Sequence, residues 1–125
     1  MEKEIRILVA DENAQTRRKT VEILATIGKF RIMEAADGEE TLTKIKEGRP
    51  SVVIIDIWMP ILETATIIRR VKTGIDRARK PAFIVTSQIN NPSMFAELGE
   101  AGAEYCAVKP LDIELLREQI GRAHV

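Results

Sequence analysis

The stretch of sequence that decides the fold is Val-Val-Ile-Ile-Asp-Ile-Trp-Met-Pro, residues 52–60. Four consecutive β-branched residues are typical of a strand that is buried on both faces of a parallel sheet. Asp56 follows these four residues directly. We expect this carboxylate at the carboxyl end of the strand, where open α/β sheets bind their ligands.

Four further short apolar runs accompany this one along the chain. The five runs predict strands over residues 5–10, 30–35, 52–57, 82–86 and 105–108. Apolar residues at helical spacing lie between the runs. Three of these segments place the following residues on one helix face: Ala14, Val21, Leu24 and Ala25; Ala65, Ile68, Val71 and Ile75; and Ile113, Leu116 and Ile120.

Residues that typically begin and end helices separate these segments. N-caps are predicted at Asp37, Asn91 and Asp112, and Glu40 completes a capping box with Asp37. Glycine accepts the left-handed backbone conformation that helix C-termini favour. Four glycines mark the expected helix ends: Gly28, Gly48, Gly74 and Gly102.

The predicted fold class is α/β, with strand and helix alternating five times in a single domain over residues 1–125. Such alternation implies a doubly wound parallel sheet with helices on both faces. We expect a flavodoxin-like (βα)5 architecture with strand order 2-1-3-4-5.

The composition excludes several classes of protein. The 125 residues include 19 Lys and Arg against 19 Asp and Glu, and this balance argues against binding nucleic acid by phosphate neutralisation. No apolar run approaches the ~20 residues of a membrane span, and the polar N-terminus shows no signal-peptide pattern. The single Cys106 excludes an intramolecular disulfide, and the single His124 disfavours histidine catalysis. We therefore expect a compact cytoplasmic domain.

Polar residues gather where the predicted strands end: Asp11 and Glu12, Asp56, Thr86 and Ser87, and Lys109. Carboxylates that lie close together repel one another unless a cation lies between them, and Mg²⁺ prefers oxygen ligands. A lysine and a hydroxyl beside them suit the oxygens of a phosphoryl group, and a carboxylate can act as a nucleophile. Each of these polar residues, taken alone, is explained by an ordinary turn or helix cap. Together they favour phosphoryl transfer onto an aspartate.

The chain resembles the receiver domain of two-component response regulators over essentially its whole length. The resemblance rests on residues 7–13 (Ile-Leu-Val-Ala-Asp-Glu-Asn), 56–60 (Asp-Ile-Trp-Met-Pro), 86–87 (Thr-Ser), and 102–103 (Gly-Ala) leading to 109–110 (Lys-Pro). These strand-end segments are most similar to the receivers of sporulation-type transcriptional regulators.

The resemblance implies that Asp56 is the phosphoacceptor of a histidine-aspartate phosphorelay. A sensor histidine kinase, a phosphotransfer protein or a small phosphodonor would supply the phosphoryl group. The implied cofactor is Mg²⁺, bound by Glu12, Asp56 and the backbone carbonyl of Trp58, with Asp11 assisting. Such a domain catalyses only its own phosphorylation and dephosphorylation.

The resemblance also implies a conformational switch. Lys109 would pair with the phosphoryl oxygens, and Thr86, with Ser87 beside it, would bond the phosphoryl group and draw its loop inward. The family usually has an aromatic switch residue three places before the lysine, where this chain has Cys106, with Tyr105 one place earlier. Successive strand residues point to opposite faces, so Tyr105 does not simply replace that aromatic residue.

Three further departures from the family pattern bear on function. Glu12 stands where Asp is common, and its longer side chain moves the ligand oxygen outward. Glu63 and Thr64 replace the usual Asp-Gly. A turn that needs positive φ is strained at threonine, so we expect a rearranged loop. The bulky Trp58 predicts a long-lived phosphoaspartate, because its ring would shield the phosphoryl group from water.

The family implies output contacts or a homodimer through the fourth helix, fifth strand and fifth helix, here residues 91–101 and 105–121. We expect no direct nucleic-acid binding by this chain and no membrane partner, so any role in transcription would require residues beyond it.

The alternative to a phosphorylated switch is a degenerate receiver that acts as a phosphorylation-independent protein-interaction module. A phosphatase is disfavoured because Trp58 stands where such enzymes carry a second aspartate. A flavin or nucleotide binder is disfavoured because Asp11 and Glu12 are acidic where an anion would have to lie.

Overall fold

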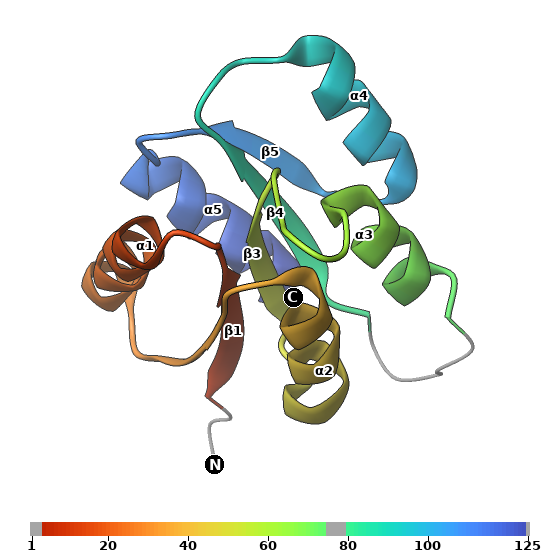
Figure 1. Ribbon diagram of the computed structural model, residues 1–125. Coiled ribbons are helices and arrows are strands. Elements are labelled where there is room, and N and C mark those ends of the chain that lie inside the picture. The colour runs from red at the N-terminus through yellow and green to blue at the C-terminus, as the bar shows by residue number, and fades with distance from the viewer. Residues whose placement is uncertain (1–3, 75–79, 125) are drawn as a thin grey trace.

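The computed structural model describes residues 4–74 and 80–124, and strands and helices alternate along them as predicted (Figure 1). The strands are β1 (Ile5–Ala10), β2 (Phe30–Ala35), β3 (Val52–Asp56), β4 (Ala82–Ser87) and β5 (Tyr105–Val108). The helices are α1 (Ala14–Ile27), α2 (Gly38–Gly48), α3 (Thr64–Lys72), α4 (Pro92–Ala101) and α5 (Ile113–His124).

The five strands form one parallel sheet in the order β2-β1-β3-β4-β5, which confirms the predicted topology. The register places Asp56 opposite Thr86 on the neighbouring strand. Two predicted strand ends were wrong by one residue, since β3 ends at Asp56 and β4 continues to Ser87. The chain leaves the sheet gradually here, because Ile57 N still donates a hydrogen bond to Thr86 O. The sheet order brings the ends of β1, β3 and β4 side by side.

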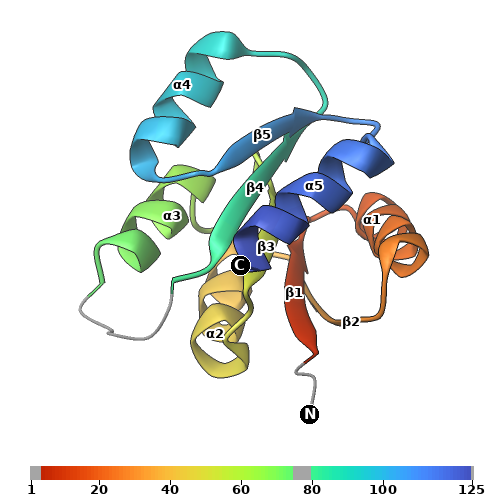
Figure 2. The same cartoon turned by 180° about the vertical axis from the view of Figure 1, so that it is seen from behind.

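Helices cover both faces of the sheet (Figures 1 and 2). One apolar cluster joins Ile55 of β3 to Ile67 of α3 and Leu98 of α4, and α2 contributes to the same face. A second cluster joins Ile54 of β3 to Leu24 of α1 and to α5. Neighbouring residues of β3 therefore serve opposite clusters, which is why the strand is apolar throughout. No helix in the described ranges is long and apolar enough to cross a membrane.

The predicted helix faces are correct in part. α1 buries Thr20 and Leu24, whereas Ala14 and Ala25 are exposed. Thr20 is accommodated because its hydroxyl donates to Thr16 O, while an alanine offers too little apolar area to mark a face reliably. Ile113 of α5 is also exposed, because it lies in the first turn, before the part of the helix that packs on the sheet. Ile75, assigned to the third helix, lies outside the described residues.

The helix starts follow the prediction, and the helices end within two residues of the predicted glycines, but only one of these glycines has a positive φ. Asp37, Asn91 and Asp112 each accept a hydrogen bond from a backbone N–H in the first turn that follows. Among the chain's seven glycines, all within the described residues, Gly102 alone has a positive φ, of 122°. Gly28 is extended, and α3 ends with Thr73 as its C-cap, before Gly74.

The left-handed residue after α2 is Arg49, with φ of 46°, rather than Gly48. A Cβ at Gly48 would lie 2.4 Å from Met33 Sδ on β2. Because this sulfur belongs to a flexible side chain, a larger residue at position 48 would have to displace the Met33 side chain; the left-handed turn falls on the next residue.

Candidate functional site

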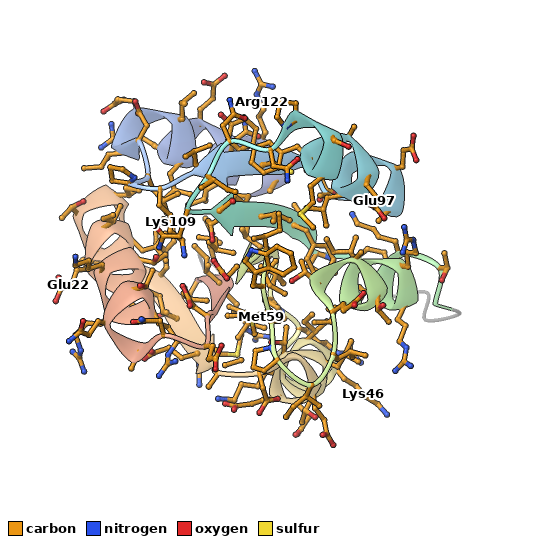
Figure 3. The ribbon with its side chains drawn as sticks, turned by 45° about the horizontal axis from the view of Figure 1, so that its top comes forward. Glu22, Lys46, Met59, Glu97, Lys109 and Arg122 are labelled. Atoms are coloured by element: carbon orange, nitrogen blue, oxygen red, sulfur yellow. The ribbon has the colours of Figure 1, made fainter. Side chains whose placement is uncertain are left out.

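A buried lysine joins two of the predicted carboxylates. Lys109 Nζ lies 2.8 Å from Asp56 Oδ1 and 3.1 Å from Asp11 Oδ2 (Figure 3, where Lys109 is labelled). The side chains of Asp11, Asp56 and Lys109 are only 8%, 13% and 11% exposed. One ammonium group therefore balances two carboxylates in a nearly dry site, and one negative charge is left over.

The backbone orients both carboxylates. Asp11 Oδ1 accepts from Asn13 N at 2.9 Å, and Asp56 Oδ2 accepts from Trp58 N at 3.1 Å. Each carboxylate thus has one oxygen on a backbone N–H and the other on Lys109. Such charge-assisted hydrogen bonds fix the direction in which an acid presents its oxygens.

Two positioning contacts were missed from the sequence. Arg17 of α1 donates from Nη1 to Asp11 O at 2.7 Å and pairs through Nε with Glu34 of β2 at 2.9 Å. Thr64, which is 2% exposed, donates from Oγ1 to Asp56 O at 2.7 Å. Arg17 belongs to a basic run with Arg18 and Lys19, which is typical of a solvated helix face and does not predict such a contact. Thr64 lies eight residues from its partner.

The two hydroxyls at the end of β4 behave differently. Ser87 is buried and bonded within its own turn, since Oγ donates to Ile89 O at 2.7 Å and accepts from Ile89 N at 3.2 Å. Thr86 is also buried, but its hydroxyl makes no hydrogen bond to any part of the described chain. The hydroxyl opposite Asp56 is thus the one that remains available to a ligand.

Cys106 and Tyr105, the residues around the family's switch position, are both half-buried in β5. Cys106 packs against the cluster on the α3 and α4 side of the sheet, and Tyr105 packs against the cluster on the α1 and α5 side. The expectation that the two point to opposite faces is confirmed. Burial raises the pKa of the Cys106 thiol.

Part of the predicted metal-ligand set lies together. Asp11 and Asp56 share one cation, and the carbonyl of Trp58 accepts no hydrogen bond from the residues that the structure describes. Glu12 is exposed, and no group of three acidic, histidine or cysteine side chains that could hold a metal ion is found in residues 4–74 and 80–124. Two buried carboxylates and a carbonyl are hard oxygen donors that fit Mg²⁺, while Glu12 as a ligand stays a prediction.

The loop between β3 and α3 is strained, though not where the sequence suggested. Thr64 begins α3 and is an ordinary helical residue, whereas the positive φ, of 72°, falls on Ile61. Ile61 is 74% exposed, and Trp58 on the same loop is 65% exposed. The tryptophan ring is thus largely in solvent, so its shielding role stays a prediction.

Comparison with known proteins gives a consistent result. A family model described as the response regulator receiver domain matches residues 7–121. Chemotaxis protein CheY of Bacillus subtilis (strain 168) is 32% identical over 117 residues, which cover 94% of this chain and 95% of that protein. A solved CheX-CheY-BeF3-Mg complex from Borrelia burgdorferi aligns with a TM-score of 0.82 at 25% identity, over 97% of this chain and 90% of that chain. CheY4 of Vibrio cholerae shares the fold, with a TM-score of 0.82 at 24% identity, over 97% of this chain and 99% of that chain.

Proposed function

Because this chain belongs to the response regulator receiver domain family, we propose that it is a phosphorylation-driven switch with Asp56 as its phosphoacceptor. Receiver domains of two-component systems are signalling modules. The observation that carries the proposal is the Lys109 ammonium shared by Asp56 and Asp11 at the carboxyl ends of the strands. This arrangement presents a nucleophilic carboxylate beside a cation that can balance phosphoryl oxygens.

In the proposed reaction a carboxylate oxygen of Asp56 forms a bond to phosphorus. With a phosphohistidine donor, the bond from phosphorus to nitrogen breaks, and the imidazole leaves with the electron pair and takes up a proton. Lys109 then shifts its charge from the free carboxylate to the new phosphoryl oxygens. Asp11 keeps the lysine in place, because its second oxygen is fixed by Asn13 N.

The proposed cofactor is Mg²⁺. When bound, it neutralises charge on the phosphoryl oxygens during transfer. Asp11 and Asp56 are the residues that would hold it, with Glu12 and the backbone carbonyl of Trp58 as further ligands. The mainly buried carboxylates leave little room for competing water at the nucleophile.

We place the switch at Thr86. Its unengaged hydroxyl lies opposite Asp56 in the register and would bond the phosphoryl group once formed, drawing in the loop before α4. The exposed apolar side chains of Ile89, Val108 and Leu115 lie in that loop, in β5 and in α5. This face is our candidate for the output domain or a second copy, while a histidine kinase or phosphotransfer protein approaches the Asp56 end.

A second candidate function is a phosphorylation-independent interaction module with the same fold. It is favoured by the exposure of Glu12 outside the Asp11–Asp56 pair and by Cys106 at the switch position. In that case a partner would bind equally well with and without a phosphoryl group on Asp56.

Amide NMR spectra recorded with Mg²⁺ and beryllium fluoride, which mimics a phosphoryl group on a carboxylate, test the switch. We expect shifts at Ile57 and at residues 105–108. The Thr86→Ala variant should retain the Ile57 shift and lose those in β5, and Asp56→Asn should show neither. Equal β5 shifts in wild type and Thr86→Ala would contradict the role given to Thr86.

A further inference from the structure

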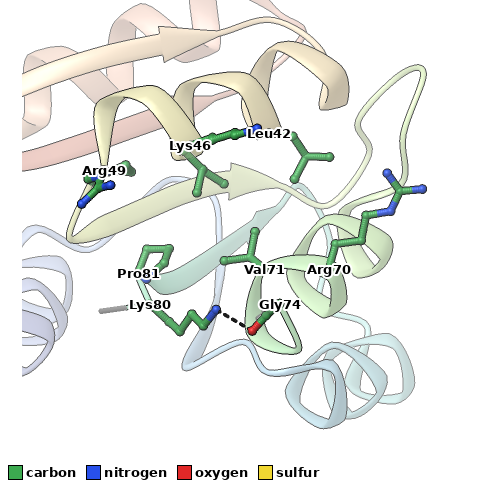
Figure 4. A pocket seen from close by; sticks show the side chains of 10 residues that line it. Leu42, Lys46, Arg49, Arg70, Val71, Gly74, Lys80 and Pro81 are labelled. Carbon is green, nitrogen blue, oxygen red and sulfur yellow. Dashed lines mark hydrogen bonds between the residues drawn. The ribbon is translucent and has the colours of Figure 1, made fainter. Parts of the chain in front are cut away.

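A cavity lies at the opposite end of the sheet from Asp56. Its volume is about 290 Å³, and it is bounded by the last turns of α2 and α3 and by the residues that precede β3 and β4 (Figure 4). Pro50 and Pro81 belong to it. Since β3 runs from this end to Asp56, the whole length of the strand separates the cavity from the phosphoacceptor site.

The cavity is strongly cationic. Lys46, Arg49, Arg70 and Lys80 line it, and none of the lining residues that the structure describes is acidic. The chain as a whole has equal numbers of basic and acidic residues, so this concentration does not come from a general basic excess. Four positive charges around one hollow attract an anion.

Six cations elsewhere in the described residues have ion-pair partners, whereas the four around the cavity make no ion pair there. Ion pairs engage Arg17, Lys44, Lys72, Lys109, Arg117 and Arg122. The side chains of Lys46, Arg49 and Arg70 make no ion pair or hydrogen bond within the ranges that the structure describes. Lys80 Nζ donates to a backbone carbonyl, Gly74 O, at 3.0 Å, as the dashed line in Figure 4 shows. Most of the donor capacity around the cavity is therefore not used by the residues that the structure describes.

The remaining lining is apolar. Ile45 and Pro81 are buried, and Leu42 and Val71 are half-buried between them. An inorganic ion would leave this apolar surface unused. A ligand that also has an apolar body removes that surface from water and gains affinity.

We propose that this cavity binds a small organic phosphate, a molecule with an apolar or aromatic body and at least two negative charges, as in a nucleoside diphosphate. The guanidinium groups of Arg49 and Arg70 offer planar pairs of donors that match phosphate oxygens. Lys46 and Lys80 add point charges, and the body lies against Ile45 and Val71. The site is separate from Asp56 and functions without Mg²⁺.

The test is a titration of the protein with ADP in EDTA at low ionic strength, followed by calorimetry and amide NMR. Adenosine and inorganic pyrophosphate are titrated separately as controls, because each contains only one of the two parts of ADP, the apolar body or the charged phosphates. We expect ADP to bind at least roughly ten-fold more tightly than either half, with amide shifts at Ile45 and Val71. Pyrophosphate binding as tightly as ADP, or millimolar ADP shifting neither amide, would overturn the proposal.

Matched variants locate the site. The double variant Arg49→Gln/Arg70→Gln should weaken ADP binding by roughly ten-fold or more, whereas Lys29→Gln/Arg31→Gln, which removes two exposed charges away from the cavity, should change it by less than about two-fold. Thermal unfolding of both variants checks that they fold. Asp56→Asn should bind ADP as wild type does, so this proposal and the proposed phosphorylation stand or fall separately. Equal weakening in both double variants would overturn the assignment.

Discussion

Thr64 shows how a single hydroxyl can connect a helix to β3, the strand that ends at Asp56. It occupies the position where the family usually has glycine, and its hydroxyl satisfies the carbonyl of Asp56 while the side chain is buried. Without that hydroxyl the carbonyl loses a partner in a site with little water. A lost hydrogen bond of this kind is costly because the acceptor stays desolvated.

We predict that Thr64→Val lowers the free energy of unfolding by about 1–2 kcal/mol. Urea denaturation monitored by circular dichroism measures the change. Thr66→Val on the same helix is the matched control, because the Thr66 hydroxyl makes no hydrogen bond within the described residues, and it should cost under about 0.5 kcal/mol. Equal losses in the two variants would show that the Asp56 contact contributes nothing.

Cys106 should be slow to react. Burial raises the pKa of its thiol above the ordinary value of 9.0, and the reactive species is the thiolate. Alkylation by iodoacetamide at pH 7 should therefore be slower than for free cysteine, and its rate should still be rising with pH beyond 9 rather than levelling off there. The same shift makes the unfolding free energy fall as the pH rises through that range, because the unfolded thiol ionises first. Rapid alkylation at neutral pH would contradict the role of burial.

Among the secondary-structure elements, the strands and the approximate helix ends were predictable, and the residues that take a positive φ after a helix were not. A continuous apolar run such as residues 52–55 has few alternatives to a buried strand. Helix ends depend on contacts from other elements. Met33 of β2 packs close to Gly48, the last residue of α2, and the left-handed turn falls on Arg49. No local pattern in the sequence reports such a contact.

The loop between β3 and α3 stores strain at Ile61, a β-branched residue with φ of 72°. We predict that Ile61→Gly raises the free energy of unfolding by about 1 kcal/mol, because glycine adopts this conformation without a Cβ clash. The side chain is mostly exposed, so little packing is lost. Ile61→Ala keeps the Cβ and should change stability little. Urea denaturation compares the two, and a less stable glycine variant would contradict the assignment of strain.

At the scale of the whole molecule, the site depends on three distant strand ends meeting at one lysine. The sequence predicted Asp11, Asp56 and Lys109 together, because parallel topology brings strand ends to one edge. It did not predict that Arg17 would hold the Asp11 carbonyl or that Glu12 would be exposed. Both outcomes depend on where the folded chain places these side chains relative to other elements, and the spacing of residues along the sequence does not predict that.

Removing the shared cation should destabilise the fold. We predict that Lys109→Met lowers the unfolding free energy by about 3 kcal/mol, because two buried carboxylates are left uncompensated. Adding Asp56→Asn to that variant should recover part of the loss by removing one of the two charges. Urea denaturation of the wild type, the two single variants and the double variant gives the coupling free energy between Lys109 and Asp56. Losses that simply add would show that Lys109 and Asp56 do not interact energetically.

Intact-mass spectrometry after incubation with acetyl phosphate and Mg²⁺ shows whether Asp56 accepts a phosphoryl group. We predict a gain of one phosphoryl group in the wild-type protein. The gain should be absent in Asp56→Asn and absent when EDTA removes the metal. No gain in folded wild-type protein at any donor concentration, or an equal gain in Asp56→Asn, would contradict the account.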